Sequence, residues 1–388
     1  MKYHIYTALF YVLPIGHVCA AGLERSNQSI QAFFEKGNYA EVSMLQVNPN
    51  VSGKVQPVSS AGNPEFSTGD MVNNQHYFQA ALKLQPHPQV SVALLFDQPF
   101  FTDVDYQFDT NQPLSEIADV EFDSNNMTAL VGYQPNANWN LFTGVSYQSF
   151  SGNLRIGTHV ENFYVDYAVH FPKDHAWGWL VGASYQLPEY AFTTAITYRS
   201  KIKHHTKARE SFWGTEIAPQ HATTIQTPES INLDFQTGLP AQNFLYASLR
   251  WGNWQDFEIQ PTQYAAMLQQ VPNMNLNLID YQKNQWSVRL GVAHQWSPKW
   301  ITAVEGLWDS GAGNPASSFN PVDGYLGLGT GLIYNFTPKT FVISGIHYLY
   351  FNQPKNAQGS SFLSQNSHFS QLEERDAWIY HLKLAHRF

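Results

Sequence analysis

The feature that most constrains this chain is an alternation of apolar and polar side chains, in segments of about ten residues, that recurs from Tyr39 to the end. Short and long connections separate these segments in strict turn. Short connections are expected at 86–89, 134–138, 187–190, 239–242, 296–299 and 335–339. Long connections are expected at 52–75, 98–118, 151–176, 201–228, 253–284, 309–323 and 352–376. This pattern is typical of an up-and-down β-barrel whose turns and loops lie on opposite sides of a membrane.

The alternation predicts an all-β fold, a 14-stranded antiparallel transmembrane barrel over residues 39–388. In the third segment, for example, Val92 and Leu94 alternate with Ser91 and Ala93. Successive side chains on a strand point to opposite faces, so the apolar set is assigned to lipid and the polar set to the lumen. An even number of strands places both chain ends in the periplasm, as bacterial barrels require.

Two details test this assignment. The stretch from Phe163 to Phe171 also alternates, and we interpret it as a strand extension or a hairpin inside a long loop. Tryptophans gather near the predicted strand ends, where interfacial girdles form. They are Trp177, Trp179, Trp251, Trp254, Trp296, Trp300 and Trp308. A secreted soluble sandwich or propeller would explain the alternation but not the order of short and long connections.

The N-terminus predicts secretion, and the composition limits the classes of partner and membrane anchor. Residues 1–20 read as a signal peptide, with Lys2 before an apolar stretch and Val18-Cys19-Ala20 at the cut. A lipoprotein reading of Cys19, the only cysteine, is the alternative. The net charge of −9 argues against nucleic acid as a partner. No segment reaches the run of roughly 18 apolar residues that a membrane helix needs.

Several motifs resemble one known family. They are the stretch Thr227–Gly238 (TPESINLDFQTG), Asp97-Gln98-Pro99-Phe100 after the third strand, Asn314-Pro315, Pro321–Tyr325 (PVDGY) and the closing Arg387-Phe388. Together they resemble the FadL family of outer-membrane long-chain fatty acid transporters, which includes the aromatic-hydrocarbon channels of the TodX type. The resemblance implies a fourteen-stranded monomeric barrel, plugged by an N-terminal hatch, that releases hydrophobic molecules sideways near a kink in its third strand.

The resemblance assigns expected roles to two segments. Residues 21–38 are the expected hatch, in which Ile30, Phe33 and Phe34 would plug the lumen; a frayed N-terminal arm is the alternative. The family's hatch is usually longer than residues 21–38 and carries an Asn-Pro-Ala motif, which this segment lacks. Pro99 and Phe100 are the expected gating residues, because proline cannot donate to a ladder and favours a kinked or unpaired site. An ordinary strand end fits Pro99 equally well.

A fatty acid also carries a carboxylate, which a lumenal cation would hold by charge-assisted hydrogen bonds. By alternation Arg199, Arg250 and Arg289 point inward, as do Lys83 and Lys383, and Arg155 is a candidate at a loop base. Pairing with lumenal acids such as Asp97, Asp234 and Glu305 is the alternative role. In the loop 253–284, Met267 and Leu268, with Val271 and Met274, are expected to form an outer apolar groove, or else to pack within the loop.

The sequence therefore predicts an outer-membrane channel for passive uptake of hydrophobic molecules, most of all long-chain fatty acids. Uptake of monoaromatic or alkane hydrocarbons is the alternative, and a plugged structural or adhesin barrel is another. Expected partners are these solutes and the lipid and lipopolysaccharide around the barrel. We expect no cofactor, no metal at His204-His205, whose side chains diverge on a strand, and no enzymatic activity, since His368 and Ser370 lack a recognisable catalytic context.

Overall fold

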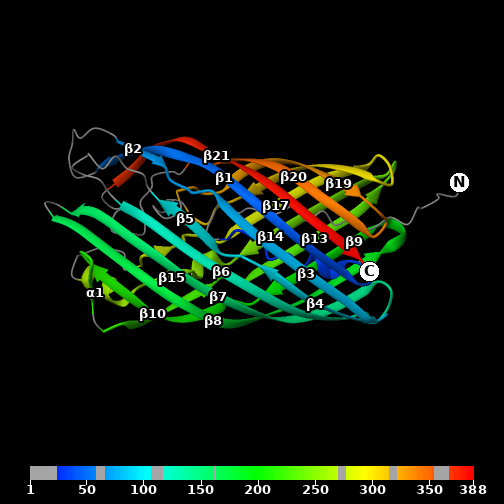
Figure 1. The fold of residues 1–388 in the computed structure, drawn as a ribbon, viewed down its shortest axis with the longest axis horizontal. Helices are drawn as coiled ribbons and strands as arrows, with labels where there is room; N and C mark the ends of the chain where they lie inside the picture. Colours follow the sequence, from blue (N-terminus) through cyan, green and yellow to red (C-terminus); the bar gives the residue numbers. More distant parts are fainter. Residues whose placement is uncertain are drawn as a thin grey trace.

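The computed structural model describes residues 24–57, 66–105, 117–160, 163–217, 219–269, 277–313, 321–353 and 367–388. The expected signal peptide therefore lies outside the described residues. Figure 1 shows a long barrel with the C-terminus and the short turns at one end, and α1, β2 and β15 at the other. We take the first end as periplasmic, as bacterial barrels require. Among the described helices, none has the length and apolar character needed to cross a membrane.

Fourteen antiparallel strands close the wall, as predicted, and the last pairs with the first. In order they are β1 (Tyr39–Pro57), β3 (Gln75–His87), β4 (Val90–Asp97), β6 (Ile117–Tyr133), β7 (Trp139–Val160), β8 (Phe163–Leu187), β9 (Phe192–Arg199), β13 (Ser230–Leu239), β14 (Asn243–Gly252), β17 (Gln285–Gln295), β18 (Trp300–Asp309), β19 (Tyr325–Asn335), β20 (Thr340–Phe351) and β21 (Ser367–Arg387).

Shorter elements extend this wall or lie inside it. They are β2 (Phe66–Asp70), β5 (Phe101–Asp105), β10 (Ile202–Phe212), β11 (Thr215–Glu216), β12 (His221–Thr227), β15 (Glu258–Ile259), β16 (Ile279–Asp280), the single turns η1 (Gln31–Phe34), η2 (Pro188–Tyr190) and η3 (Trp254–Asp256), and the helix α1 (Thr262–Leu268). β5 follows β4 after a break, and β10 pairs with both β8 and β12.

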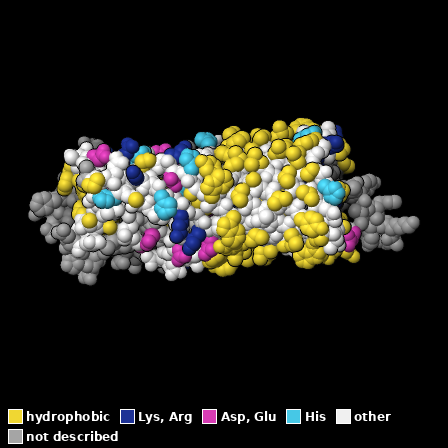
Figure 2. All heavy atoms as spheres, turned by 90° about the horizontal axis from the view of Figure 1, so that it is seen from below, with side chains coloured by type: hydrophobic (Ala, Val, Ile, Leu, Met, Phe, Trp, Pro, Cys, Tyr) yellow, Lys and Arg dark blue, Asp and Glu magenta, His cyan; other side chains and the backbone are white. Residues whose placement is uncertain are grey.

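The predicted faces are confirmed. On β17, Val288 and Leu290 are exposed on the wall while Ser287 and Arg289 are buried inside. On the face that it draws, Figure 2 shows the resulting hydrophobic band over the periplasmic half of the barrel, with charged side chains beyond it. The tryptophans at 177, 179, 296, 300 and 308 are exposed on the wall, as girdle residues should be. The prediction for Trp254 was wrong: it is fully buried inside the barrel.

The short connections lie within a residue or two of their predicted places, but several long loops were predicted too long. β1 continues to Pro57, β21 begins at Ser367, and β5 lies within the predicted loop 98–118. Two further predicted loops are mostly strand. Residues 151–160 belong to β7 and residues 163–176 to β8, and the two strands continue as one hairpin. Within the predicted loop 201–228, β10 and β12 pair as a hairpin. These strands continue above the bilayer because their inward side chains, such as Leu154 and Ile156, still face a buried core.

The lumen is filled by two apolar cores at different heights. The extracellular core gathers the inward side of the long hairpins around the loop 253–284; its members include Phe100, Phe150, Phe171, Trp254, Phe257, Tyr264 and Leu268. The periplasmic core lies around the N-terminal segment and includes Ile30, Phe33, Tyr39, Leu95, Phe142 and Phe341. Polar and charged side chains, among them Arg199 and Arg250, are buried between them.

Candidate functional site

The barrel wall is interrupted between β4 and β5. β4 ends at Asp97 and β5 begins at Phe101, and Pro99 between them has no N–H to donate. β3 pairs with β4 only from Ala80 onward, so Gln75–Gln79 pair with β1 alone. The side chain of Gln98 replaces one of the missing ladder bonds between β3 and β4: its Oε1 accepts a hydrogen bond from Phe78 N at 2.9 Å. The kink expected at Pro99 is therefore a gap in the backbone ladder.

The N-terminal segment stands behind this gap, inside the barrel. Arg25 N donates to Pro99 O at 2.7 Å, and Glu24 forms an isolated bridge with Phe100. Ser26 Oγ donates to the Asp97 carboxylate at 2.7 Å. The segment thus takes the position of a missing strand and satisfies backbone groups that the break leaves without ladder partners.

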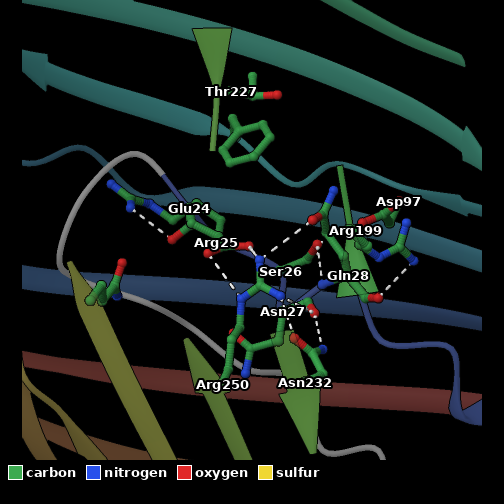
Figure 3. Close-up of polar contacts among 12 residues, drawn as sticks. Glu24, Arg25, Ser26, Asn27, Gln28, Asp97, Arg199, Thr227, Asn232 and Arg250 are labelled. Atoms are coloured by element: carbon green, nitrogen blue, oxygen red, sulfur yellow. Dashed lines mark hydrogen bonds and ion pairs between the residues drawn. The ribbon is translucent and has the colours of Figure 1, made fainter. Parts of the chain in front are cut away.

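A buried polar layer holds the segment to the opposite wall (Figure 3). Arg250 on β14 forms an ion pair with Glu24, with Nε donating to Oε2 at 3.1 Å. Arg199 on β9 donates to Gln28 O at 2.9 Å, and Asn232 on β13 donates to Asn27 O at the same distance. Arg250, Glu24 and Arg199 are all more than nine-tenths buried. Charge and hydrogen bonds, rather than apolar packing alone, fix the segment at mid-barrel.

Below the polar layer the segment ends in aromatic packing. Phe33 and Phe34 each lie 5.6 Å, centroid to centroid, from Phe142 in edge-on geometry. Phe33 is fully buried and Phe34 partly so, as a lumenal plug requires. Glu35 then accepts hydrogen bonds from Arg387 at 2.8 and 2.9 Å, which ties the segment to the last strand.

Two hollows lie on either side of the wall beside the gap. The lipid-facing groove has a volume of about 470 Å³ and is lined by Ala40, Val42, Leu82, Leu94, Met127 and Leu384, among others. The lumenal hollow holds about 30 Å³ and is lined by Ser29, Gln79, Asp97 and Arg199, among others. Both are also lined by Glu41, Ala80, Ala81 and Phe96. The wall between them is therefore one strand thick and built partly from alanine.

The structure places the other predicted cations in different surroundings. Arg289 lies inside the lumen, 5.6 Å over the Tyr246 ring, and lines a hollow of about 10 Å³ with Phe34 and Asp234. Arg155 instead lies on the outer face of β7, half exposed, where it pairs with Asp166 of β8 at 2.9 Å. That position does not favour Arg155 as an anchor inside the barrel.

The expected outer groove of the loop 253–284 takes another form. Leu268 is fully buried in the extracellular core and Met267 packs against it. Both residues thus favour the alternative of packing within the barrel mouth over an exposed groove. Val271 and Met274 lie outside the described residues. The gating candidate Phe100 belongs to the same core, where its ring meets Trp254 edge-on at 6.0 Å.

Sequence reasoning missed a second polar cluster, on the wall opposite the gap. Glu305 accepts hydrogen bonds from Tyr246 Oη and interacts with His347 Nε2, both at 2.8 Å, and all three are buried. Glycines make room for the rings: a Cβ at Gly291 would lie 2.2 Å from Tyr246, and one at Gly329 2.0 Å from His347. Among the described residues, no group of three or more His, Cys, Asp or Glu side chains could hold a metal.

Replacing Gly329 with alanine is expected to destabilise the barrel by about 1–3 kcal/mol, the usual cost of overpacking a filled interior. The added Cβ would displace the His347 ring, which cannot move without losing its 2.8 Å contact with Glu305. The measurement is the temperature at which the folded barrel loses its compact mobility on a gel. Gly306→Ala is the matched control, because a Cβ there meets nothing within 4 Å. Equal melting of both variants would contradict the packing argument.

Comparisons with known proteins agree with this architecture. The profile of the outer membrane protein transport protein family (OMPP1/FadL/TodX) matches residues 32–388. No curated protein matches the chain. A crystal structure of a Pseudomonas aeruginosa FadL homologue is 14% identical, with a TM-score of 0.72 over 92% of each chain. The P. putida toluene transporter TodX is 12% identical, with a TM-score of 0.64 over 92% of this chain and 91% of that one. The Ralstonia pickettii toluene transporter TbuX is 11% identical, with a TM-score of 0.59 over 98% and 99%.

Proposed function

Because the chain belongs to the outer membrane protein transport family (OMPP1/FadL/TodX), we propose that it is a passive channel for hydrophobic molecules, above all long-chain fatty acids. Membership in this family places the protein in the outer membrane, as the sequence predicted. In our proposal the solute enters from outside, passes the N-terminal segment and leaves sideways through the barrel wall. The function includes no catalytic step, cofactor or metal.

One observation carries the proposal: the lumenal hollow and the lipid-facing groove share four wall residues beside the break in the third strand. Ala80 and Ala81 leave little side chain between the two spaces. On the side that faces β4, the stretch Gln75–Gln79 has no ladder, so the wall can part there without breaking one. A solute that reached the hollow would meet an apolar groove open to lipid, which favours lateral release over release into the periplasm.

Passage requires the N-terminal segment to move, because the lumenal hollow of about 30 Å³ is far smaller than an acyl chain. Arg199 lines that hollow and at present donates to Gln28 O of the segment. A fatty acid carboxylate could replace this carbonyl as the acceptor and gain a charge-assisted hydrogen bond. We infer that Arg199 is the anchor for the acid group, with Arg250 and Arg289 deeper in ion-paired or stacked positions.

The first experiment is uptake of labelled oleate and labelled toluene by cells with and without this gene. Gene-dependent oleate uptake supports the fatty acid proposal. Gene-dependent toluene uptake alone would move the proposal to aromatic hydrocarbons, the solutes named for TodX and TbuX. No gene-dependent uptake of either would favour a permanently plugged structural or adhesin barrel.

The proposed role of Arg199 can be tested by substitution. Arg199→Ala is expected to lower oleate uptake relative to toluene uptake by about tenfold, since a charge-assisted hydrogen bond contributes on the order of 1.5–3 kcal/mol. The ratio of the two rates is the measurement, because any general loosening of the N-terminal segment would affect both solutes. Arg155→Ala, which removes an exposed arginine outside the lumen, should leave the ratio unchanged. An equal loss of both rates in the Arg199 variant would remove the carboxylate anchor.

A further inference from the structure

A strip of basic side chains lies on the outward face of β10. Inward residues of this strand, from Ile202 to Ala208, are buried, while Lys203, His205, Lys207 and Arg209 are all exposed on the other face. Because alternate residues on a strand are about 6.6 Å apart, these four side chains span roughly 20 Å. We name them the basic strip. The basic strip thus concentrates positive charge in one place on a chain whose net charge is −9.

The strip is not neutralised by its neighbours. Among the described residues, no acid lies within ion-pair distance of Lys203, Lys207 or Arg209. Asp174 on β8 has other partners: its Oδ2 contacts His204 Nδ1 at 3.2 Å and accepts a hydrogen bond from His205 N at 3.1 Å. His170, Lys173 and His175 on β8 are exposed beside the strip and extend its basic character.

The strip stands at a defined height above the membrane. Tyr147, Trp177 and Trp179 are exposed on the adjoining strands, with the Tyr147 and Trp177 rings 4.8 Å apart, and they mark the outer edge of the apolar band. Gly178 lies against Ile202, so β10 starts at the level of this belt and Lys203 follows immediately. Figure 2, which looks at this side of the barrel, shows basic, histidine and acidic side chains just beyond the band. This is the headgroup layer of the outer leaflet.

The nearby wall formed by β5 and β6, which β7 and β8 separate from β10, has the opposite charge. Asp103, Asp105, Asp119, Glu121 and Asp123 lie on the outward side of β5 and β6 in cross-strand register. Burial and the neighbouring carboxylates Asp105 and Asp103 raise the pKa of the Asp119 carboxyl. These carboxylates would repel an anionic headgroup, so the acidic stretch limits where around the wall such a headgroup can bind.

We propose that the basic strip is a binding site for the phosphorylated headgroup of lipopolysaccharide. A row of cations about 7 Å apart can engage several phosphate groups of one large headgroup at once, and Arg and Lys both bind phosphate by charge-assisted hydrogen bonds. The belt below the strip holds the acyl chains beside Tyr147 and Trp177. The site is distinct from the lumen and the wall gap, and it does not depend on which solute the channel carries.

The test compares two double variants of the full-length barrel that remove the same charge. Lys203→Gln/Lys207→Gln alters the strip. Lys299→Gln/Lys339→Gln alters exposed lysines in the periplasmic turns. Each purified barrel is reconstituted into nanodiscs that contain lipopolysaccharide, and the bound lipid is counted by native mass spectrometry after graded release by salt. We expect the strip variant to retain about tenfold less lipopolysaccharide than wild type, because each lysine near an anionic surface contributes appreciably to binding. The turn variant should retain as much lipopolysaccharide as wild type.

A second arm uses the same lipid with its lipid A phosphates removed enzymatically. Wild-type retention should fall to the level of the strip variant. Three outcomes would overturn the proposal: equal retention by wild type and the strip variant, an equal loss in the turn variant, or undiminished binding of the dephosphorylated lipid. Because the substitutions are at exposed side chains, compact gel mobility of every variant confirms that the barrels being compared are folded.

Discussion

Replacing Ala80 with tryptophan is expected to reduce uptake of the transported solute by about tenfold, which corresponds to ~1.4 kcal/mol in the barrier to passage. Ala80 lies on β3 at the last position paired with β4 before the wall gap, and it lines both the lumenal hollow and the lipid-facing groove. An indole there would fill the groove and cover the thinnest part of the wall. The initial rate of oleate or toluene uptake, whichever the wild-type gene supports, is the measurement.

The matched control is Gly306→Trp. Gly306 also faces lipid, on β18 at the far side of the barrel, and a Cβ built there meets no atom within 4 Å. An indole at this position should change neither folding nor uptake. If both variants transport like wild type, the solute does not leave beside Ala80. If both fail equally, the effect is one of assembly and not of the exit, which quantitative surface labelling of the folded barrel would reveal.

Much of the wall could be predicted because it depends on local pattern. A strand buries every second residue, so the inward positions of Arg199, Arg250 and Arg289 followed from counting. The short turns followed from the loss of alternation. The extended hairpins did not, because above the bilayer the outward face becomes polar, as at Arg155, and such a stretch reads as a loop unless the buried inner face is known.

The contents of the lumen depend on contacts between residues far apart in the chain. Arg250 could be placed inside the barrel, yet nothing near it in sequence indicates Glu24, 226 residues away, as its partner. Helix α1 is a second case. It has no side-chain cap of its own, and Glu210 of β10 accepts hydrogen bonds from Gln263 N at 3.0 Å and Tyr264 N at 2.8 Å instead. That long-range cap holds α1 inside the barrel mouth, which is why Met267 and Leu268 do not form an exposed groove.

Replacing Glu24 with glutamine is expected to open the barrel to small ions. Glu24 and Arg250 are both buried, so removing one charge leaves the other without its ion-pair partner, at a cost of about 3–5 kcal/mol. The wall strands are held by their own ladders, whereas the N-terminal segment relies on the polar layer. The cost therefore acts on the docking of the segment, and occupancy of the plugged state should fall by a factor of about 10² or more. Single-channel recordings in planar bilayers, with conductance and open time as readouts, measure this directly.

Two further variants separate docking from general damage. Glu24→Arg/Arg250→Glu keeps both charges and reverses the pair, so it should close the channel again at least partly. Arg155→Ala breaks an ion pair of similar length, but that pair is half exposed and outside the lumen, where it contributes only about 0–1 kcal/mol. It should leave the conductance at the wild-type level. A Glu24→Gln channel as silent as wild type would show that aromatic packing of Phe33 and Phe34 around Phe142 is sufficient to hold the segment, and that the polar layer positions it without determining whether it stays.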